Sequence, residues 1–209
     1  MSYKDEFLRA ASFSASRNYA LDAPLSQLHL DGSLQAAVHY CATFIEPWLE
    51  QLDGLGFDKF RQFGVECANV HVSMLDKMHK LFPGIAAMAN LTIGEFELDG
   101  KTEFSLTQDD FLAWSSEEAP TFSGHTWLTI GYDYILDLTG ATYLNTRIRS
   151  VDDFGGLIKG RHDEKLDVFW PYDMRPERSP LKMKTLTYHP VVVGRQALHA
   201  KAPRRIDGQ

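Results

Sequence analysis

Three residues of this chain have the types that nucleophilic catalysis through sulfur requires: Cys67, His125 and Asp137. A cysteine attacks as its thiolate, and a neighbouring imidazole takes the thiol proton and later returns it to a leaving group. The imidazole needs an acceptor for its second nitrogen, which fixes its tautomer and orientation. Together the three residues predict a thiol nucleophile, a general base and an orienting carboxylate.

The position of Cys67 in the sequence favours a reactive thiol. Apolar residues recur at intervals of three or four from Cys67 to Phe82, after the flexible Gly64, which predicts a helix that begins near the cysteine. Unpaired N–H groups and the dipole at a helix start favour a negative charge. The other cysteine, Cys41, lies in the middle of an apolar helical stripe, and we interpret it as a packing residue.

The clearest hairpin of the sequence would bring the other two residues together. The segments HTWLTI and YILDLT are predicted strands, joined by a three-residue turn at Gly131–Asp133. With this turn, His125 and Asp137 become diagonal neighbours on one face, within reach of each other's side chains. A two-residue turn would place them on opposite faces. An aspartate in so apolar a strand also needs a buried partner, and an imidazole supplies one.

The order of the remaining elements predicts an α+β fold, because helical patterns come first and strand patterns follow. The length favours one domain, with a helical segment at 1–60, an α+β core at 61–200 and a flexible tail at 201–209. The other predicted helices are 5–16, a segment that begins at Ser33, 107–114 and 194–201; the other predicted strands are 88–98, 101–106, 146–150, 166–170 and 181–188.

The composition limits the classes of partner. The net charge of −7 argues against nucleic acid. The chain has no apolar run long enough to span a bilayer and its start, MSYKDEFLRA, has no signal-peptide core, so we expect no membrane partner and a cytoplasmic location. Two cysteines are too few for a disulfide framework or a cysteine-rich zinc site, and no metal or cofactor is expected. The sequence leaves the oligomeric state open.

The stretches GVECANVHVSMLDKM, GHTWLTI and DYILDLT resemble the transglutaminase-like branch of the papain-like superfamily. Many bacterial members carry a pattern close to G-x-C at a helix start, then H-x-W on a strand and D-x-T on the next. The chain departs from this pattern at its first part, because Gly64 stands three residues before Cys67. Glu66 directly precedes the cysteine, and its charge would act to raise the pKa of the thiol.

This resemblance implies a papain-like architecture in which N-terminal helices pack on an antiparallel β-sheet. It also implies acyl chemistry, in which Cys67 attacks an amide or peptide carbonyl, His125 moves the proton and Asp137 orients His125. The thioester is then passed to water or to an amine, so the expected substrate is a small-molecule, peptide or protein amide. Two alternatives remain open: a non-catalytic binding module on the same scaffold, and transfer from acyl-CoA as in arylamine N-acetyltransferases.

Four further residues are candidates for supporting roles. Gln62 could point its amide at an oxyanion, as a glutamine upstream of the cysteine does in papain-like peptidases, although the backbone N–H of Cys67 is also available. Trp127 and Trp170 are candidate substrate-cleft residues; for Trp170, core or interface packing is the alternative. His71 lies four residues after the cysteine on the same helix face, as an alternative base or, with the thiol, as part of a metal site.

Overall fold

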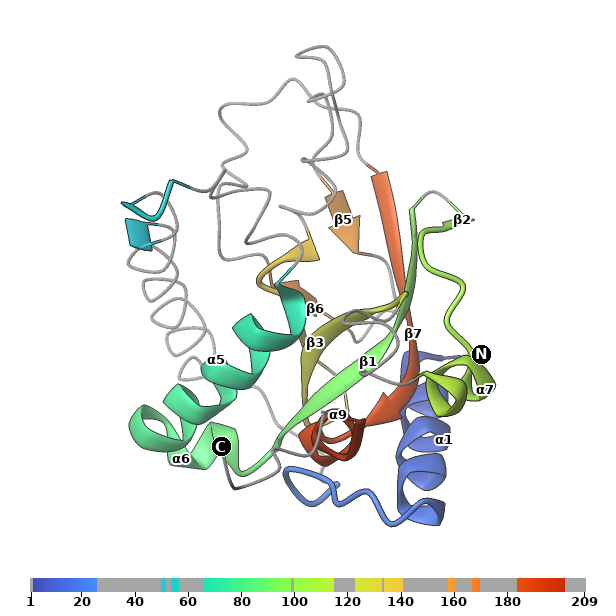
Figure 1. The fold of residues 1–209 in the computed structure, drawn as a ribbon, viewed down its shortest axis with the longest axis horizontal. Coiled ribbons are helices and arrows are strands. Elements are labelled where there is room, and N and C mark those ends of the chain that lie inside the picture. The colour runs from blue at the N-terminus through green and yellow to red at the C-terminus, as the bar shows by residue number, and fades with distance from the viewer. Residues whose placement is uncertain are drawn as a thin grey trace, which may run out of the picture.

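The computed structural model describes residues 2–25, 50–51, 54–56, 66–98, 100–114, 123–132, 134–140, 158–160, 167–169 and 184–201. Helices combine with a curled sheet in an α+β arrangement (Figure 1). The helices are α1 (Tyr3–Ser16), α5 (Cys67–Leu81), α6 (Pro83–Ala86), α7 (Gln108–Ala113) and α9 (Arg195–Lys201). The strands are β1 (Ala89–Leu98), β2 (Lys101–Thr102), β3 (His125–Ile130), β4 (Tyr134–Leu136), β5 (Ile158–Gly160), β6 (Asp167–Phe169) and β7 (Lys184–Val193).

The strands in the described residues form one sheet in the order β5-β7-β1-β3-β4-β6, and β2 pairs with β1. The central neighbours β7, β1, β3 and β4 run antiparallel, as predicted. The outer pairs, β4 with β6 and β5 with β7, are parallel. No sequence pattern indicated these two pairs, because parallel neighbours are joined by long crossovers and leave no local turn signal.

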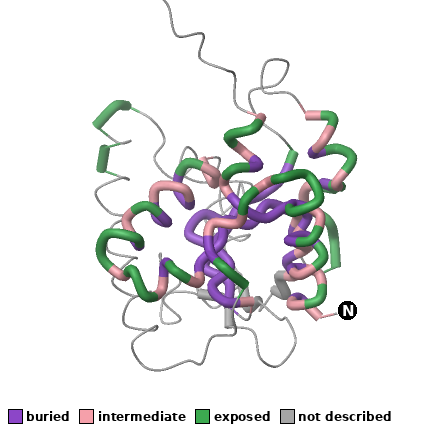
Figure 2. Tube along the Cα trace, turned by 90° about the horizontal axis from the view of Figure 1, so that it is seen from below, coloured by how far each residue is buried: buried purple, intermediate pink, exposed green. Residues whose placement is uncertain are grey.

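Helices cover both faces of the sheet. The apolar side chains of α5 form one cluster with Leu128 and Ile130 of β3. Trp127, the residue directly before Leu128, belongs to another cluster that includes Tyr3 and Phe7 of α1. Because successive side chains of a strand point to opposite faces, α5 and α1 lie on opposite sides of the sheet. The strands between them are the most buried part of the described chain (Figure 2).

Most of the predicted helices in the described residues are confirmed, with small shifts at their ends. Helix α1 begins at Tyr3, earlier than predicted, because Ser2 and Asp5 form a capping box. Helix α7 begins after Thr107, as predicted, with a second capping box. None of the helices in the described ranges is long and apolar enough to cross a membrane.

Two strands differ in length from the predictions. The strand predicted at 101–106 shrinks to β2, and the chain turns away from the sheet at Ser105, whose φ is 59°. Strand β7 runs on to Val193 through Pro190, which is accommodated because the register shifts between Ile93 and Gly94 of β1. The predicted helix from Ser33, the predicted strand 146–150 and the tail beyond Lys201 lie outside the described residues.

Candidate active site

The hairpin of β3 and β4 has the predicted three-residue turn. Its ladder begins with Ile130 opposite Tyr134. Strand β4 then ends at Leu136, so Asp137 follows the strand and does not lie within it as predicted. The predicted closeness nevertheless holds, because Nε2 of His125 lies 2.7 Å from Oδ2 of Asp137.

The carboxylate of Asp137 is fully buried and surrounded by donors. Its Oδ1 accepts the backbone N–H groups of Thr139 (2.9 Å) and Gly140 (2.8 Å), and its Oδ2 accepts His125 and the Tyr188 hydroxyl (2.8 Å). Burial acts to raise the pKa of this carboxyl, but the charge and hydrogen bond of His125 outweigh it and hold the pKa well below its usual range. Asp137 therefore stays ionised and can orient the imidazole.

A tight turn holds Asp137 in this position. A Cβ atom at Gly140 would lie 2.3 Å from Oδ2 of Asp137, so a larger residue would displace the carboxylate. An aspartate that accepts the backbone N–H two residues on is typical of an Asx turn. The Asp-x-Thr-Gly pattern was therefore the signal for a turn at Asp137, where the sequence interpretation extended the strand.

Cys67 is the first residue of α5 and is partly exposed. The side chain of Glu66 at the N-cap does not cap the backbone N–H groups of the first turn, and its carboxylate accepts from the side-chain amide of Asn69. Burial acts to raise the pKa of the thiol. Hydrogen bonding and charge from His125, with contributions from the side chain and backbone of Thr126, act against burial, and the net pKa is lowered. The sulfur is thus set up to ionise despite the neighbouring Glu66.

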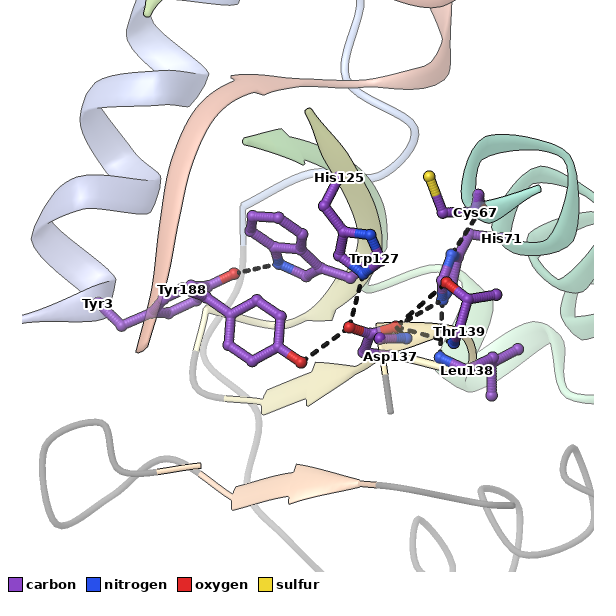
Figure 3. Close-up of polar contacts among 10 residues, drawn as sticks. Tyr3, Cys67, His71, His125, Trp127, Asp137, Leu138, Thr139 and Tyr188 are labelled. Atoms are coloured by element: carbon purple, nitrogen blue, oxygen red, sulfur yellow. Dashed lines mark hydrogen bonds and ion pairs between the residues drawn. The ribbon is translucent and has the colours of Figure 1, made fainter. Parts of the chain in front are cut away.

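His125 lies beside Cys67, and its imidazole hydrogen-bonds the carboxylate of Asp137 (Figure 3). Since its Nε2 donates to Asp137, Nδ1 is the nitrogen that remains for Cys67. Burial acts to lower the pKa of this imidazole, but the charge of Asp137 and its hydrogen bond raise it overall. The rings of Phe96 and Phe104 lie 5.0 and 6.0 Å from the imidazole, centroid to centroid, and limit its movement.

His71 does not fit the role of a base. Its Nε2 accepts the backbone N–H of Leu138 (2.9 Å), so its proton lies on Nδ1, which donates to the carbonyl oxygen of Cys67 (2.7 Å). The ring is therefore neutral, and the 3.7 Å between its Nε2 and Oδ1 of Asp137 is not an ion pair. Because both nitrogens are engaged, His71 cannot bind a metal in this arrangement. It joins the start of α5 to the turn after β4.

In the part of the chain that the structure describes, no group of three or more His, Cys, Asp or Glu side chains is placed to hold a metal ion.

The buried, neutral His71 should make the stability depend on pH. Burial lowers its pKa to about 4 from an ordinary 6.5. Stability from the neutral ring is thus fully present above about pH 6.5 and is lost as the pH falls towards 4, by an amount on the order of 3 kcal/mol. We expect urea unfolding to show this fall for the wild type and a flatter profile for His71→Gln. His79→Gln, at an exposed position of the same helix, serves as the control and should keep the wild-type dependence of the free energy of unfolding on pH. The same pH dependence in all three proteins would contradict a buried, neutral His71.

The structure changes the interpretation of Trp127. The predicted cleft residue is fully buried, and its Nε1–H donates to the hydroxyl of Tyr3 (2.8 Å). Its ring packs against Tyr188, 5.0 Å away between centroids. The burial does not support a place in a substrate cleft, so Trp127 is a core residue that supports the site. The other two supporting candidates, Gln62 and Trp170, lie outside the described residues.

Sequence reasoning missed two residues that the structure brings to the site. Tyr188 reaches Asp137 from β7, two strands away from β3 in the sheet, and no local spacing could indicate this contact. Thr126 lies next to His125 in the sequence, but its contribution became visible only once the face of β3 that meets α5 was known.

No protein-family model, curated protein or solved structure matches the chain. The geometry of the site is therefore the basis for its interpretation. That geometry combines a thiol at a helix start, an imidazole and a buried carboxylate, which together can form a nucleophile and carry a proton.

Proposed function

We propose that this chain catalyses acyl chemistry through a thioester on Cys67, as a cysteine hydrolase or acyltransferase of the transglutaminase-like class. The observation that carries the proposal is the buried His125–Asp137 hydrogen bond of 2.7 Å beside a cysteine at the first turn of α5. The order of the three residues, and a helix packed on a mainly antiparallel sheet, are compatible with a papain-like fold.

The proton first moves from the thiol of Cys67 to Nδ1 of His125, which gives a thiolate and an imidazolium. The thiolate attacks the carbonyl carbon of an amide and forms a tetrahedral intermediate. His125 then donates its proton to the amide nitrogen as the C–N bond breaks, which leaves a thioester and a free amine. In the second half, His125 takes a proton from water or from an acceptor amine, which attacks the thioester and releases Cys67.

Asp137 supports both halves of this reaction without accepting the proton. Its hydrogen bond to Nε2 holds the tautomer in which Nδ1 faces the thiol, and its charge stabilises the imidazolium. The oxygen of the tetrahedral intermediate can be stabilised by the backbone N–H of Cys67, because the first N–H groups of a helix have no acceptor within the helix. Gln62 stays a predicted second donor.

The proposal can be tested by acylation with p-nitrophenyl acetate in a Cys41→Ala background, with the modified residue identified by mass spectrometry. We expect an acetyl group on Cys67 that hydroxylamine removes, formed faster in the native protein than in the same chain unfolded in urea. His125→Ala should remove this advantage. Acylation of the native chain at the rate of the unfolded chain would overturn the proposal and favour a binding module.

Acetyl-CoA as a second donor separates the two kinds of acyl chemistry. Acetylation of Cys67 by p-nitrophenyl acetate alone supports amide hydrolysis or transfer from an amide. Rapid acetylation by acetyl-CoA as well would support transfer from acyl-CoA, as in arylamine N-acetyltransferases.

A further inference from the structure

The side chain of Thr126 lies on the face of the sheet that α5 covers. Leu128 and Ile130, two and four residues further along β3, pack in the cluster formed with α5. Side chains at alternate positions of a strand share a face, so Thr126 continues this row. Cys67 is the first residue of α5, and Thr126 acts to lower the pKa of its thiol. The row of side chains on this face of β3 therefore ends next to the start of the helix.

The hydroxyl of Thr126 is fully buried and makes no hydrogen bond of normal geometry to the described residues. A buried hydroxyl without a partner costs stability, so such a group in a folded protein needs an explanation. Both the hydroxyl and the backbone N–H of Thr126 act on the thiol of Cys67 in the direction that favours the thiolate. A hydroxyl is a good donor to an anion and a thiol is only a weak acceptor.

The early end of β4 makes room for this contact. Strand β4 ends at Leu136, which is paired with Leu128. Nearer the start of β3, where Thr126 lies, the structure describes no strand partner on this side. Both the backbone and the hydroxyl of Thr126 act there to lower the pKa of Cys67. The thiol therefore lies at the point where the ladder between β3 and β4 has ended.

We propose that Thr126 is a catalytic residue whose hydroxyl donates a hydrogen bond to the sulfur of Cys67 in its thiolate state. This inference rests on the proposed function, because it assigns a hydrogen-bond donor to the thiolate of the ion pair between Cys67 and His125. While the thiol is protonated, the hydroxyl has only a weak acceptor and stays unsatisfied. When the proton passes to His125, the negative sulfur becomes a strong acceptor, so the bond forms in the reactive state.

The test compares Thr126→Val, which keeps the shape and removes the hydroxyl, with Thr126→Ser, which keeps the hydroxyl, both in a Cys41→Ala background. The measured quantity is the pH midpoint for alkylation of Cys67 by iodoacetamide. We expect Thr126→Val to raise the midpoint by about one pH unit, a change typical of losing one hydrogen bond to a charged group. Thr126→Ser should restore the wild-type midpoint. Below the wild-type midpoint, where the thiol is protonated, Thr126→Val should also raise the melting temperature, because it removes a buried hydroxyl that is unsatisfied in that state.

The outcomes separate this inference from the proposed function. A wild-type midpoint that is low and depends on His125, together with an unchanged midpoint in Thr126→Val, would overturn the role of Thr126 and leave the proposed function standing. Below the wild-type midpoint, a lower melting temperature in Thr126→Val with no rescue by Thr126→Ser would show a structural role and also overturn the inference. An ordinary wild-type thiol midpoint would overturn both.

Discussion

Replacement of His125 by alanine is expected to slow alkylation of Cys67 by iodoacetamide at about pH 6 by roughly 10- to 100-fold. An ordinary thiol with a pKa of about 8.5 is almost entirely protonated at this pH, whereas the imidazolium of His125 stabilises the thiolate in the wild type. The gain in alkylation rate is smaller than the increase in the thiolate fraction, because a thiolate of lower pKa is also a weaker nucleophile.

The measurement uses a Cys41→Ala background, so that only Cys67 can react. His199→Ala, a substitution of an exposed histidine on α9, serves as the matched control and should leave the rate unchanged. Equal rates for the wild type and His125→Ala below pH 7 would show that the imidazole does not activate the thiol.

Asp137→Ala is expected to cause the largest loss of stability among the site variants, about 3–5 kcal/mol in the free energy of unfolding. The carboxylate accepts from His125, Tyr188 and the backbone N–H groups of Thr139 and Gly140, all of them buried. Alanine leaves these donors without an acceptor in a site that water cannot easily fill. Urea denaturation at pH 7 measures the loss.

Asp137→Asn separates the structural from the chemical part of this role. The amide oxygen can still accept the two backbone N–H groups, so the loss of stability should be smaller than for alanine. The amide has no negative charge for His125, so the thiol should lose most of its reactivity at about pH 6. A stable Asp137→Asn protein with wild-type reactivity would contradict the orienting role, and a loss below about 1 kcal/mol for Asp137→Ala would contradict the structural one.

Local patterns in the sequence were sufficient for the elements that carry the site. Helical periodicity placed the start of α5 at Cys67, because one face of this helix packs on the sheet. The three-residue turn fixed the register of β3 and β4, and with it the meeting of His125 and Asp137. These predictions depend on contacts between residues close in sequence, for which helix periodicity and turn length allow few alternative arrangements.

The remaining features of the site depend on contacts between distant segments. The second nitrogen of His71 is occupied by Leu138, which spacing along the helix could not reveal, so the sequence left His71 open as a base. Tyr188 comes to Asp137 through the pairing of β7 with β1. Trp127 was predicted to line a substrate cleft, but it packs with side chains of α1 on that face of the sheet.

The measurement that tests the central claim most directly is a pH titration of the thiolate absorbance of Cys67, taken as the difference between the Cys41→Ala protein and its Cys67→Ser derivative. We expect the thiolate signal to persist well below the pH at which an ordinary thiol ionises and to shift to higher pH in His125→Ala. A thiolate that appears only near pH 8.5, with or without His125, would contradict an activated thiolate–imidazolium pair, and with it the proposed acyl chemistry.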